Sequence, residues 1–256
     1  MEVYGQFASV YDLFMNEVDY DAWAKQVEKL WQRAGFRPKR LLEMGCGTGN
    51  ITLPLAQKGY EMTGVDLSEE MLTQAEEKAR KAGLSVDFYC QDMCEMDVPV
   101  EADGVLCLCD GLNYLTEPEE VQEAFFAAAE HLKDGGFFLF DLNTAQKFRQ
   151  MLGNKTYTQL EDAAAYIWEN DFDEETQINT YDVTFFVKKE NGLYERVEEI
   201  HQEKAYDLFV IEIMLQNAGF RLLSVTDDQT DEPGSDESFR WTILAAKEEW
   251  EDEGDE

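Results

Sequence analysis

Short apolar runs alternate with amphipathic runs between residues 40 and 142, and this alternation restricts the fold more than any other feature of the sequence. The apolar runs have the length of buried strands, and they read RLLEM (40–44), EMTGVDLS (61–68), SVDFYC (85–90), ADGVLCLC (102–109) and GGFFLFDL (135–142). Strands that alternate with helices form a parallel sheet, and the helices cover its two faces. We therefore expect an α/β fold.

The runs between these strands carry signals for the start and the end of helices. Ser68 is placed to cap one helix and Gly83 to end it, because a serine accepts from the first turn and a glycine adopts the left-handed cap. Thr116 and Glu119 fit a capping box at the start of another helix. Apolar residues recur at helical spacing, and the expected helices cover residues 20–35, 50–59, 68–83 and 116–132.

The pattern changes after this region. Residues 156–206 alternate rather than follow a helical period, and Asn191-Gly192 is a strong hairpin signal, so we expect an antiparallel insertion of about three strands. A helix over 207–218 and two strands, 220–227 and 239–248, follow, and consecutive strands without a helix between them pair antiparallel. The prediction is a Rossmann-like, seven-stranded, mostly parallel sheet with an antiparallel last strand, plus a small antiparallel β insertion.

These patterns also suggest how the chain divides. We expect a main domain of residues 1–142 and 207–247, an inserted β subdomain of residues 143–206, and an acidic tail of residues 248–256. The inserted subdomain is placed either to cover a bound molecule or to form a contact in a homodimer.

The charge of the chain limits its partners. Acidic residues outnumber basic ones by 55 to 21, and the net charge of −34 repels phosphate backbones, which makes nucleic acid a poor candidate partner. We expect no membrane span, because the chain has no run of eighteen apolar residues, and no secretory signal in residues 1–14. Five cysteines, an odd number in a chain with a large core, indicate reduced thiols and a cytoplasmic location.

Glycines alternate with other residues in LLEMGCGTGN (41–50), directly after the first expected strand. A parallel sheet binds ligands beyond the carboxyl ends of its strands, and bare backbone lets a ligand approach closely. Asp66 ends the second strand, where a carboxylate accepts from a ribose diol, and Asp92 follows the third, where it could accept from an adenine amino group. Each feature alone also fits a tight turn, a helix cap or a solvated loop.

The ligand expected from these residues is a dinucleotide or an adenosyl compound. The spacing here is G-x-G-x-G, whereas the dinucleotide fingerprint is G-x-G-x-x-G. Glu43 stands two residues before the first glycine, where it would repel a pyrophosphate but attract an amino group. The charges therefore favour S-adenosylmethionine as the cofactor, with an oxidoreductase as a distant alternative.

From these residues onward, the sequence resembles the class I S-adenosylmethionine-dependent methyltransferases. The resemblance covers residues 36–142 and, more loosely, the final helix and two strands. It is carried by the motifs LLEMGCGTGN, GVDLSEEML, CQDM, CLCDGLNYLTEPEE and LKDGGFFLFDLN. The stretch FASVYDLFMNEVDYDAWA also resembles a bacterial subgroup that has a β insertion before the last helix.

The resemblance implies cofactor contacts at the ends of the first four strands. Glu43 would hold the methionine part, Asp66 the ribose hydroxyls and Asp92 the adenine edge. An N-terminal aromatic, Tyr11, would help to close the pocket, although it also fits simple helix packing. The implied cofactor residues are Tyr11, Glu43, Gly45, Cys46, Gly47, Asp66, Leu67, Met71, Asp92, Met93 and Cys109.

Methyl transfer is an in-line displacement that depends mainly on orientation, and it needs a base only when the acceptor keeps its proton. Asp110 follows the fourth strand and could orient an amine or accept a proton, or it is only a turn residue. His201 lies in the insertion and fits either an acid–base group or a structural histidine. His131 falls late in a helix, where an imidazolium favours the dipole, so we expect it to be structural.

The insertion is rich in aromatic residues that could line an acceptor pocket or simply pack within a sheet. They are Tyr166, Trp168, Tyr181, Phe185, Phe186 and Tyr194. Zinc is conceivable at the cysteines of strands three and four, but C-x-x-x-C and C-x-C are not the usual zinc spacings, so no metal is expected.

The function expected from the sequence is methyl transfer from S-adenosylmethionine to a small-molecule acceptor. Two alternatives stay open: a methyltransferase for RNA or protein, and a non-catalytic module that binds an adenosyl compound. The acidic balance weighs against RNA, and the three carboxylates at the strand ends weigh against a decayed cofactor site.

Overall fold

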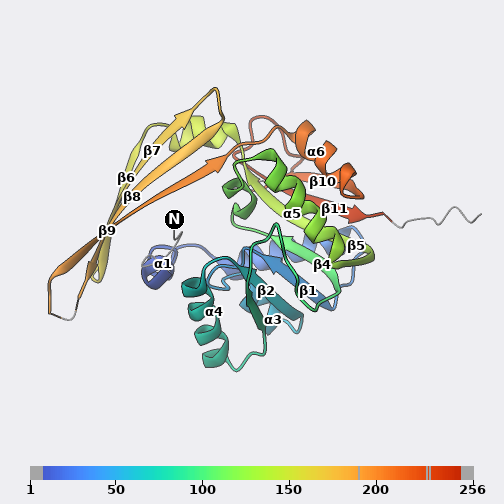
Figure 1. Cartoon of the computed structure of the whole chain (residues 1–256), viewed down its shortest axis with the longest axis horizontal. Helices are drawn as coiled ribbons and strands as arrows, with labels where there is room; N and C mark the ends of the chain where they lie inside the picture. Colours follow the sequence, from blue (N-terminus) through green and yellow to red (C-terminus); the bar gives the residue numbers. More distant parts are fainter. Residues whose placement is uncertain (1–7, 190, 229, 231, 249–256) are drawn as a thin grey trace, which may run out of the picture.

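The computed structural model describes residues 8–189, 191–228, 230 and 232–248 of the chain. The expectations for the start of the chain and for the acidic tail fall mostly on residues 1–7 and 249–256, which lie outside the described residues. Figure 1 shows a main domain built on one large sheet and a second sheet that extends from one side of it.

The main sheet has seven strands in the order β10-β11-β5-β4-β1-β2-β3. The five strands β1 to β5 are mutually parallel, while β11 pairs antiparallel with both β5 and β10. This confirms the predicted fold class. The strands are β1 (Arg40–Met44), β2 (Glu61–Asp66), β3 (Asp87–Cys90), β4 (Ala102–Cys107), β5 (Leu132–Asn143), β10 (Phe220–Asp227) and β11 (Arg240–Lys247).

Helices cover both faces of the main sheet. Helices α2 and α3 contribute to one core cluster, and α5 and α6 contribute to the other. The helical elements are α1 (Ala8–Phe14), α2 (Tyr20–Arg33), α3 (Thr52–Gln57), α4 (Glu69–Ala82), the short η1 (Gly111–Tyr114), α5 (Pro118–Glu130), the π-helical turn η2 (Lys147–Leu152) and α6 (Leu208–Asn217). No helix in the described part of the chain combines the length and the apolar character that a membrane crossing requires.

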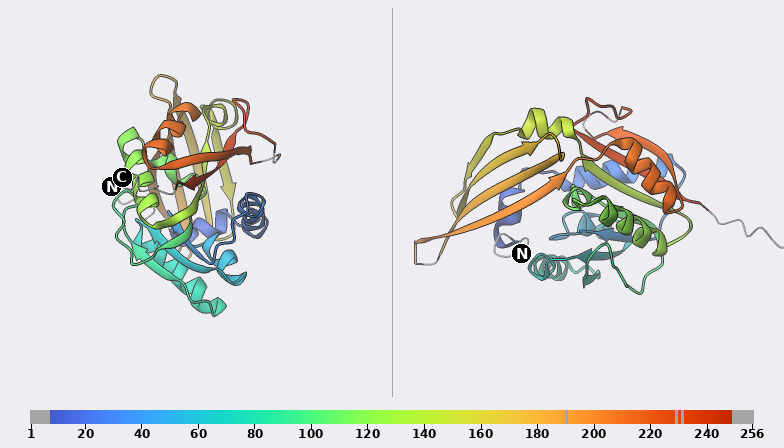
Figure 2. Two further views of the ribbon diagram at one scale, coloured as in Figure 1. Left: turned by 90° about the vertical axis from the view of Figure 1, so that its right-hand side faces the viewer. Right: turned by 45° about the horizontal axis from the view of Figure 1, so that its top comes forward.

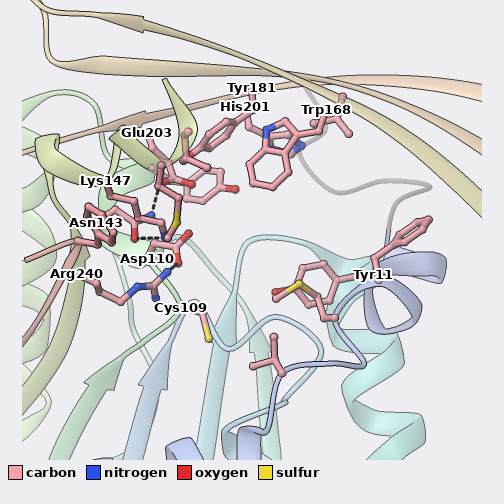
Figure 3. Close-up of a pocket in the computed structure, with 18 of the residues that line it drawn as sticks. Tyr11, Cys109, Asp110, Asn143, Lys147, Trp168, Tyr181, His201, Glu203 and Arg240 are labelled. Atoms are coloured by element: carbon pink, nitrogen blue, oxygen red, sulfur yellow. Dashed lines mark hydrogen bonds and ion pairs between the residues drawn. The ribbon is translucent and has the colours of Figure 1, made fainter. Parts of the chain in front are cut away.

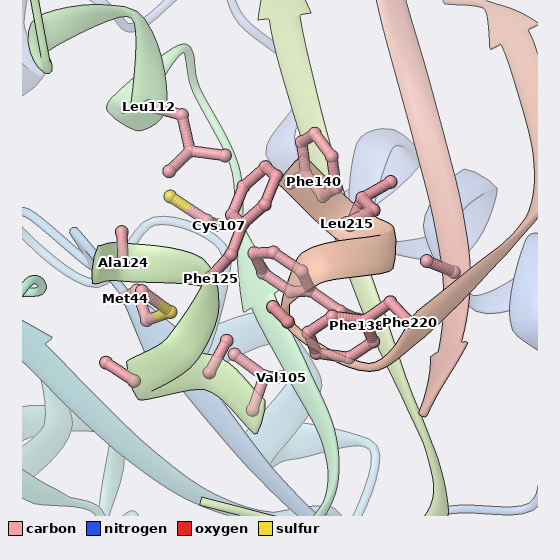
Figure 4. Packing of buried hydrophobic residues seen from close by; sticks show 14 of the residues in the cluster. Met44, Val105, Cys107, Leu112, Ala124, Phe125, Phe138, Phe140, Leu215 and Phe220 are labelled. Carbon is pink, nitrogen blue, oxygen red and sulfur yellow. The ribbon is translucent and has the colours of Figure 1, made fainter. Parts of the chain in front are cut away.

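Strand β5 shows why the sheet is buried on both sides. Successive side chains of a strand point to opposite faces, so Phe138 and Phe140 pack with α5 and α6, whereas Phe137 and Leu139 pack with α2. Figure 4 shows the first group, in which the rings of Phe125 and Phe140 have centroids 5.3 Å apart. A continuous apolar run is therefore the signature of this central strand.

The inserted sheet has four antiparallel strands in the order β6-β7-β8-β9, one more than expected. They are β6 (Thr156–Leu160), β7 (Ala164–Asp173), β8 (Ile178–Lys188) and β9 (Tyr194–Lys204). The predicted hairpin joins β8 to β9, where Gly192 has φ of 79°. The extra strand, β6, has only five residues and pairs only with β7, so its short sequence gives little pattern.

Most helix ends lie where the sequence predicts them, with one correction. Ser68 caps α4 by accepting from the Met71 amide at 3.2 Å, and Gly83 ends it in the left-handed conformation. The capping box of α5 is formed by Glu117 and Glu120, whereas the sequence predicted Thr116 and Glu119. The shift has a physical reason, because Pro118 fits the first helical position, where its missing N–H costs nothing.

Candidate methyl-transfer site

Two adjoining cavities lie at the carboxyl ends of the central strands. The first has a volume of about 530 Å³ and borders the glycine loop, and we call it the glycine-loop cavity. The second has a volume of about 540 Å³ and lies between the main sheet, α1, α2 and the inserted sheet; we call it the insertion cavity (Figure 3). Tyr11, Cys109 and Tyr114 line both cavities, so the two spaces share this wall.

Every residue implied for the cofactor lines the glycine-loop cavity. These residues come from α1 and α4, from the ends of β1 and β2, and from the segments that follow β1, β2, β3 and β4, and the fold brings them to one space. They are Tyr11, Glu43, Gly45, Cys46, Gly47, Asp66, Leu67, Met71, Asp92, Met93 and Cys109. Their contact with a cofactor stays a prediction. It requires that these residues face one cavity, and they do.

The glycine loop presents backbone to this cavity. Gly45 and Gly47 have φ angles of 64° and 53°, in the left-handed region that other residues rarely adopt. A Cβ atom on Gly45 would lie 3.3 Å from the terminal methyl of Met93, which also borders the cavity. A side chain at this position would therefore disturb the wall of the cavity as well as the turn.

Asp66 is fixed by backbone donors at the end of β2. Its two carboxylate oxygens accept from the Gly47 amide at 2.7 Å and from the Ser68 amide at 2.9 Å. Burial raises the pKa of Asp66 above its ordinary value, although these amide hydrogen bonds oppose the shift. The carboxylate is thus held in place before any ligand binds, which lowers the entropic cost of binding.

Glu43 is the most deeply placed acid of the glycine-loop cavity. Only 2% of its surface is exposed, and its carboxyl group accepts from the hydroxyl of Thr52. Burial raises the pKa of Glu43 to about 8, and the charge of Asp66 adds to the effect. Glu43 is therefore largely protonated at pH 7, and a cation in the cavity would favour its ionised form.

A polar network that the sequence did not reveal ties α1 to this cavity. The first carboxylate oxygen of Asp12 accepts from Thr48 at 2.7 Å and from Asn50 at 2.9 Å. The second accepts from the Lys78 ammonium at 2.7 Å, and Lys78 also donates to the Asn50 side chain at 2.6 Å. We call these four residues the α1 latch; they hold the helix that carries Tyr11 against the glycine loop and α4.

The inserted sheet supplies an aromatic wall to the insertion cavity. Four of the six aromatic residues expected there line the cavity, namely Tyr166, Trp168, Tyr181 and Phe185. The other two fit the alternative that the sequence left open, namely packing within the sheet. Phe186 and Tyr194 do not border the cavity because they fall on the opposite face of the sheet, as the alternation of side chains along a strand requires.

An ionic cluster forms the polar end of the insertion cavity. Arg240 at the start of β11 donates to Asp141 and, at 2.6 Å, to Asp110. Its guanidinium carbon also lies 5.4 Å from the centroid of the Trp23 ring. Burial would raise the pKa of Asp110, but the charges of Arg240 and Lys147 outweigh it and hold the pKa below its ordinary value. Asp110 is therefore an ionised partner of Arg240 rather than a base for neutral pH.

Three further polar residues border the same end of the cavity. Asn143 accepts from the Lys147 ammonium at 2.7 Å and donates to Glu203 at 2.8 Å. Burial raises the pKa of Glu203 to about 8, and the charge of Asp110 adds to the effect. Burial and the charge of Arg240 lower the pKa of Lys147. Sequence reasoning missed all of these residues, because no local motif marks them.

The structure separates the two histidines. His201 lines the insertion cavity, and its Nε2 lies 3.1 Å from a carboxylate oxygen of Glu199 on the same strand. His131 instead lies at the end of α5, where its Nδ1 contacts the Ala127 carbonyl at 2.8 Å and its Nε2 accepts from the Val98 amide at 3.4 Å. Both contacts are with backbone groups and His131 lines neither cavity, so its setting is structural.

The cysteines considered for zinc have separate surroundings. Cys90 contacts the carbonyl of Leu67, whereas Cys94 contacts the carbonyl of Glu120. In the described ranges, no group of three or more His, Cys, Asp and Glu side chains is placed to hold a metal ion.

Comparison with known proteins identifies the family. A family model described as a methyltransferase domain matches residues 41–136. A protein of Geobacillus sp. strain WCH70, which carries a provisional methyltransferase name, is 38% identical over 95% of this chain and 99% of its own length. A solved S-adenosylmethionine-dependent methyltransferase from Clostridium acetobutylicum is 32% identical over 96% of this chain and 99% of that chain, with a TM-score of 0.85. The chain belongs to the class I S-adenosylmethionine-dependent methyltransferases.

A more distant structure shows the same fold with the cofactor in place. CalS10, an amino pentose methyltransferase from Micromonospora echinaspora solved with S-adenosylmethionine bound, is 18% identical and has a TM-score of 0.74 over 96% of this chain and 98% of its own. The matched family model and the relatives at 32% and 38% identity establish S-adenosylmethionine as the cofactor and methyl transfer as the enzymatic activity of this chain.

Proposed function

We propose that this methyltransferase acts on a small molecule bound in the insertion cavity, with the cofactor in the glycine-loop cavity. The observation that carries the proposal is the shared wall of Tyr11, Cys109 and Tyr114. A methyl group can pass between two ligands only where their sites touch, and these three side chains are the ones that border both spaces. Cys109 and Asp110 also have positive φ angles of 61° and 57°, so strained backbone lies at this wall.

The residues of the glycine-loop cavity fit the chemistry of S-adenosylmethionine. When bound, the cofactor supplies a methyl group that is activated by a positive sulfur atom. The buried carboxyl of Glu43 is placed to bind a cationic amino group, and the fixed carboxylate of Asp66 is placed to accept from a ribose diol. Asp92 follows β3 on the same cavity and would accept from the adenine amino group.

The shape of the insertion cavity supports a small acceptor. The inserted sheet, α1 and α2 all contribute to its walls, and its volume of about 540 Å³ is in the range of small-molecule sites. Figure 2 shows the inserted sheet extending past one end of the main domain, with α1 beside it. The four aromatic rings on this sheet would cover the body of the acceptor and exclude water from the reacting atoms.

The first experiment measures binding of S-adenosylmethionine and S-adenosylhomocysteine by calorimetry in wild type, Asp66→Asn and Glu76→Ala. Glu76 is an exposed acid on α4 and serves as the matched control. We expect Asp66→Asn to weaken both ligands about tenfold or more, because it removes a charged acceptor, and Glu76→Ala to leave both unchanged. Equal binding by all three proteins would contradict the cofactor placement.

The second experiment follows labelled methyl groups from the cofactor into a metabolite extract, purified RNA and a protein mixture. We expect label in the small-molecule fraction only. Transfer to RNA or protein would contradict a small acceptor.

A further inference from the structure

We propose that the methyl acceptor has an acidic oxygen, either a carboxylate or a phenolate, on an apolar body. Lys147 is the residue that binds this anionic oxygen. The inference rests on the proposed function, because it names the chemical class of the molecule in the insertion cavity.

Lys147 is the cation of this cavity that has binding capacity to spare. An ammonium group has three donors, and the Lys147 ammonium uses one of them on the side-chain oxygen of Asn143 at 2.7 Å. Among the residues that the structure describes, no carboxylate lies within 4.0 Å of this ammonium. The remaining donors of Lys147 can therefore form charge-assisted hydrogen bonds to an anionic oxygen in the cavity.

The other cation of the cavity is already neutralised. Arg240 forms ion pairs with Asp110 and Asp141, and its third nitrogen lies 3.9 Å from Asp228. Arg240 therefore fixes the ends of β4, β5 and β11 together and is a poor partner for a further anion. Asp110, Glu203 and Asp141 also act on Lys147 from beyond contact distance, so Lys147 is the cation at this end of the cavity that a ligand can still contact.

Glu203 does not cancel this charge near neutral pH. Burial raises the pKa of Glu203 to about 8, so the carboxyl group is mostly protonated at pH 7. Its neighbour Asn143 donates to it at 2.8 Å while accepting from Lys147, which orients both groups. A protonated amine acceptor would be repelled, because its positive charge would lie near that of Lys147. Asp110 would not offset this repulsion, because it is already paired with Arg240.

The polar end lies where the reacting atom must be. Asp110 follows Cys109, one of the three residues shared by the two cavities, and Figure 3 shows Asp110, Lys147 and Glu203 grouped above Cys109. The aromatic wall, with Trp168 and Tyr181, covers the rest of the space. An acceptor with an acidic oxygen at the polar end and an apolar body under the rings fits both halves of the cavity.

The transfer step then balances without a base. The acceptor enters as its anion, and the oxygen forms a bond to the methyl carbon while the electrons of the methyl–sulfur bond stay on sulfur. An anion and a sulfonium are converted into an ester or an ether and a neutral thioether. The product no longer carries the charge that Lys147 binds, and this favours its release.

The test uses matched ring compounds, namely benzoate, benzylamine and benzamide, on protein saturated with S-adenosylhomocysteine. Calorimetry measures their affinities for wild type, Lys147→Met, Lys147→Arg and Lys25→Met, the last being an exposed control on α2. We expect wild type to prefer benzoate over benzylamine. We expect Lys147→Met to weaken benzoate about 10- to 100-fold, because it removes a charge-assisted hydrogen bond. Lys147→Arg and Lys25→Met should keep most of the affinity, and benzamide should change little in any variant.

Three outcomes would overturn the inference: a preference for benzylamine, no binding of benzoate at millimolar concentration, or equal benzoate affinities in wild type and Lys147→Met. Retained binding of S-adenosylhomocysteine shows that each variant is folded. If wild type itself fails to bind S-adenosylhomocysteine, the cofactor placement is wrong, and this result is distinct from a wrong acceptor class.

Discussion

At the scale of single residues, buried carboxyl groups distinguish this site. Glu43 and Glu203 lie in different cavities, yet burial raises the pKa of each to about 8. Arg240 has the opposite effect on Asp110, whose pKa is held below its ordinary value. The site thus holds both protonated and ionised acids near pH 7. We expect a charged ligand in either cavity to change how many protons the protein carries.

The first prediction concerns proton release when the cofactor binds. With a pKa of about 8, Glu43 is roughly nine-tenths protonated at pH 7 in the free protein. A bound cation lowers that pKa, so binding should release close to one proton at pH 7, and the release should shrink above pH 8, where the group is already ionised. Calorimetry in buffers of different ionisation enthalpy measures the number of protons.

Glu43→Gln is the matched variant for this measurement, because glutamine keeps the size and a hydrogen-bonding oxygen but cannot ionise. The difference in proton count between wild type and Glu43→Gln isolates the contribution of this carboxyl from that of the cofactor's own amino group. The same proton count in both proteins would show that Glu43 stays protonated and does not bind the cation.

At the scale of elements, helix α1 borders both cavities, and polar contacts hold it in place. Asp12 of the α1 latch accepts from residues of the glycine loop and from Lys78 of α4. The same helix packs on the inserted sheet, where the rings of Phe14 and Tyr166 have centroids 4.9 Å apart. Helix α1 therefore borders both the glycine-loop cavity and the insertion cavity.

The second prediction follows from this arrangement. Asp12→Ala removes two hydrogen bonds from neutral donors and one from the Lys78 ammonium, and it should weaken S-adenosylmethionine binding about tenfold, mainly by speeding dissociation. Stopped-flow displacement measures the rate. Asp21→Ala, an exposed acid in the first turn of α2, is the control and should leave the rate unchanged. An unchanged rate in Asp12→Ala would mean that α1 does not close the cavity.

The third prediction concerns a strand. Gly104 lies inside β4, and a Cβ atom there would come within 2.3 Å of Phe137 and 2.9 Å of Leu41. Both neighbours are fully buried, so the core has no room to yield. Gly104→Ala should lower the free energy of unfolding by about 1–3 kcal/mol, as overpacking does. Urea unfolding measures this, and adding Phe137→Leu should restore part of the loss if the clash is the cause.

At the scale of the whole molecule, the sequence predicted the main sheet because each of its strands and helices carries a local period. The strand ends also predicted that the glycine loop, Asp66 and Asp92 share one cavity, since the carboxyl ends of parallel strands meet at one edge. Other lining residues, such as Tyr11 and Met71, were implied by the family resemblance. The ionic cluster could not be found in this way. Arg240 and Asp110 are 130 positions apart, and only the antiparallel return of β11 beside β5 brings them together.

The two cavities also draw on different segments of the chain. In the described part of the chain, the glycine-loop cavity has no lining residue from positions 143–206, whereas the insertion cavity takes about half of its wall from that segment. Changes in the inserted sheet should therefore alter the acceptor half of the reaction and leave the cofactor half intact.

The last prediction tests this division with two neighbouring residues of β8. Phe185 lines the insertion cavity and is 2% exposed, whereas Phe186 lies on the other face of the same strand. Phe185→Ala should lower kcat/KM for the acceptor found in the metabolite screen about 10- to 100-fold, the effect of losing one buried ring. Phe186→Ala should change it less than about twofold, because a surface ring away from the cavity contributes little.

Cofactor affinity, measured by calorimetry, should be the same in both variants and in wild type. Equal losses of kcat/KM in the two variants would place the acceptor outside the insertion cavity, and a loss of cofactor affinity in Phe185→Ala would show that the two halves are coupled through the inserted sheet.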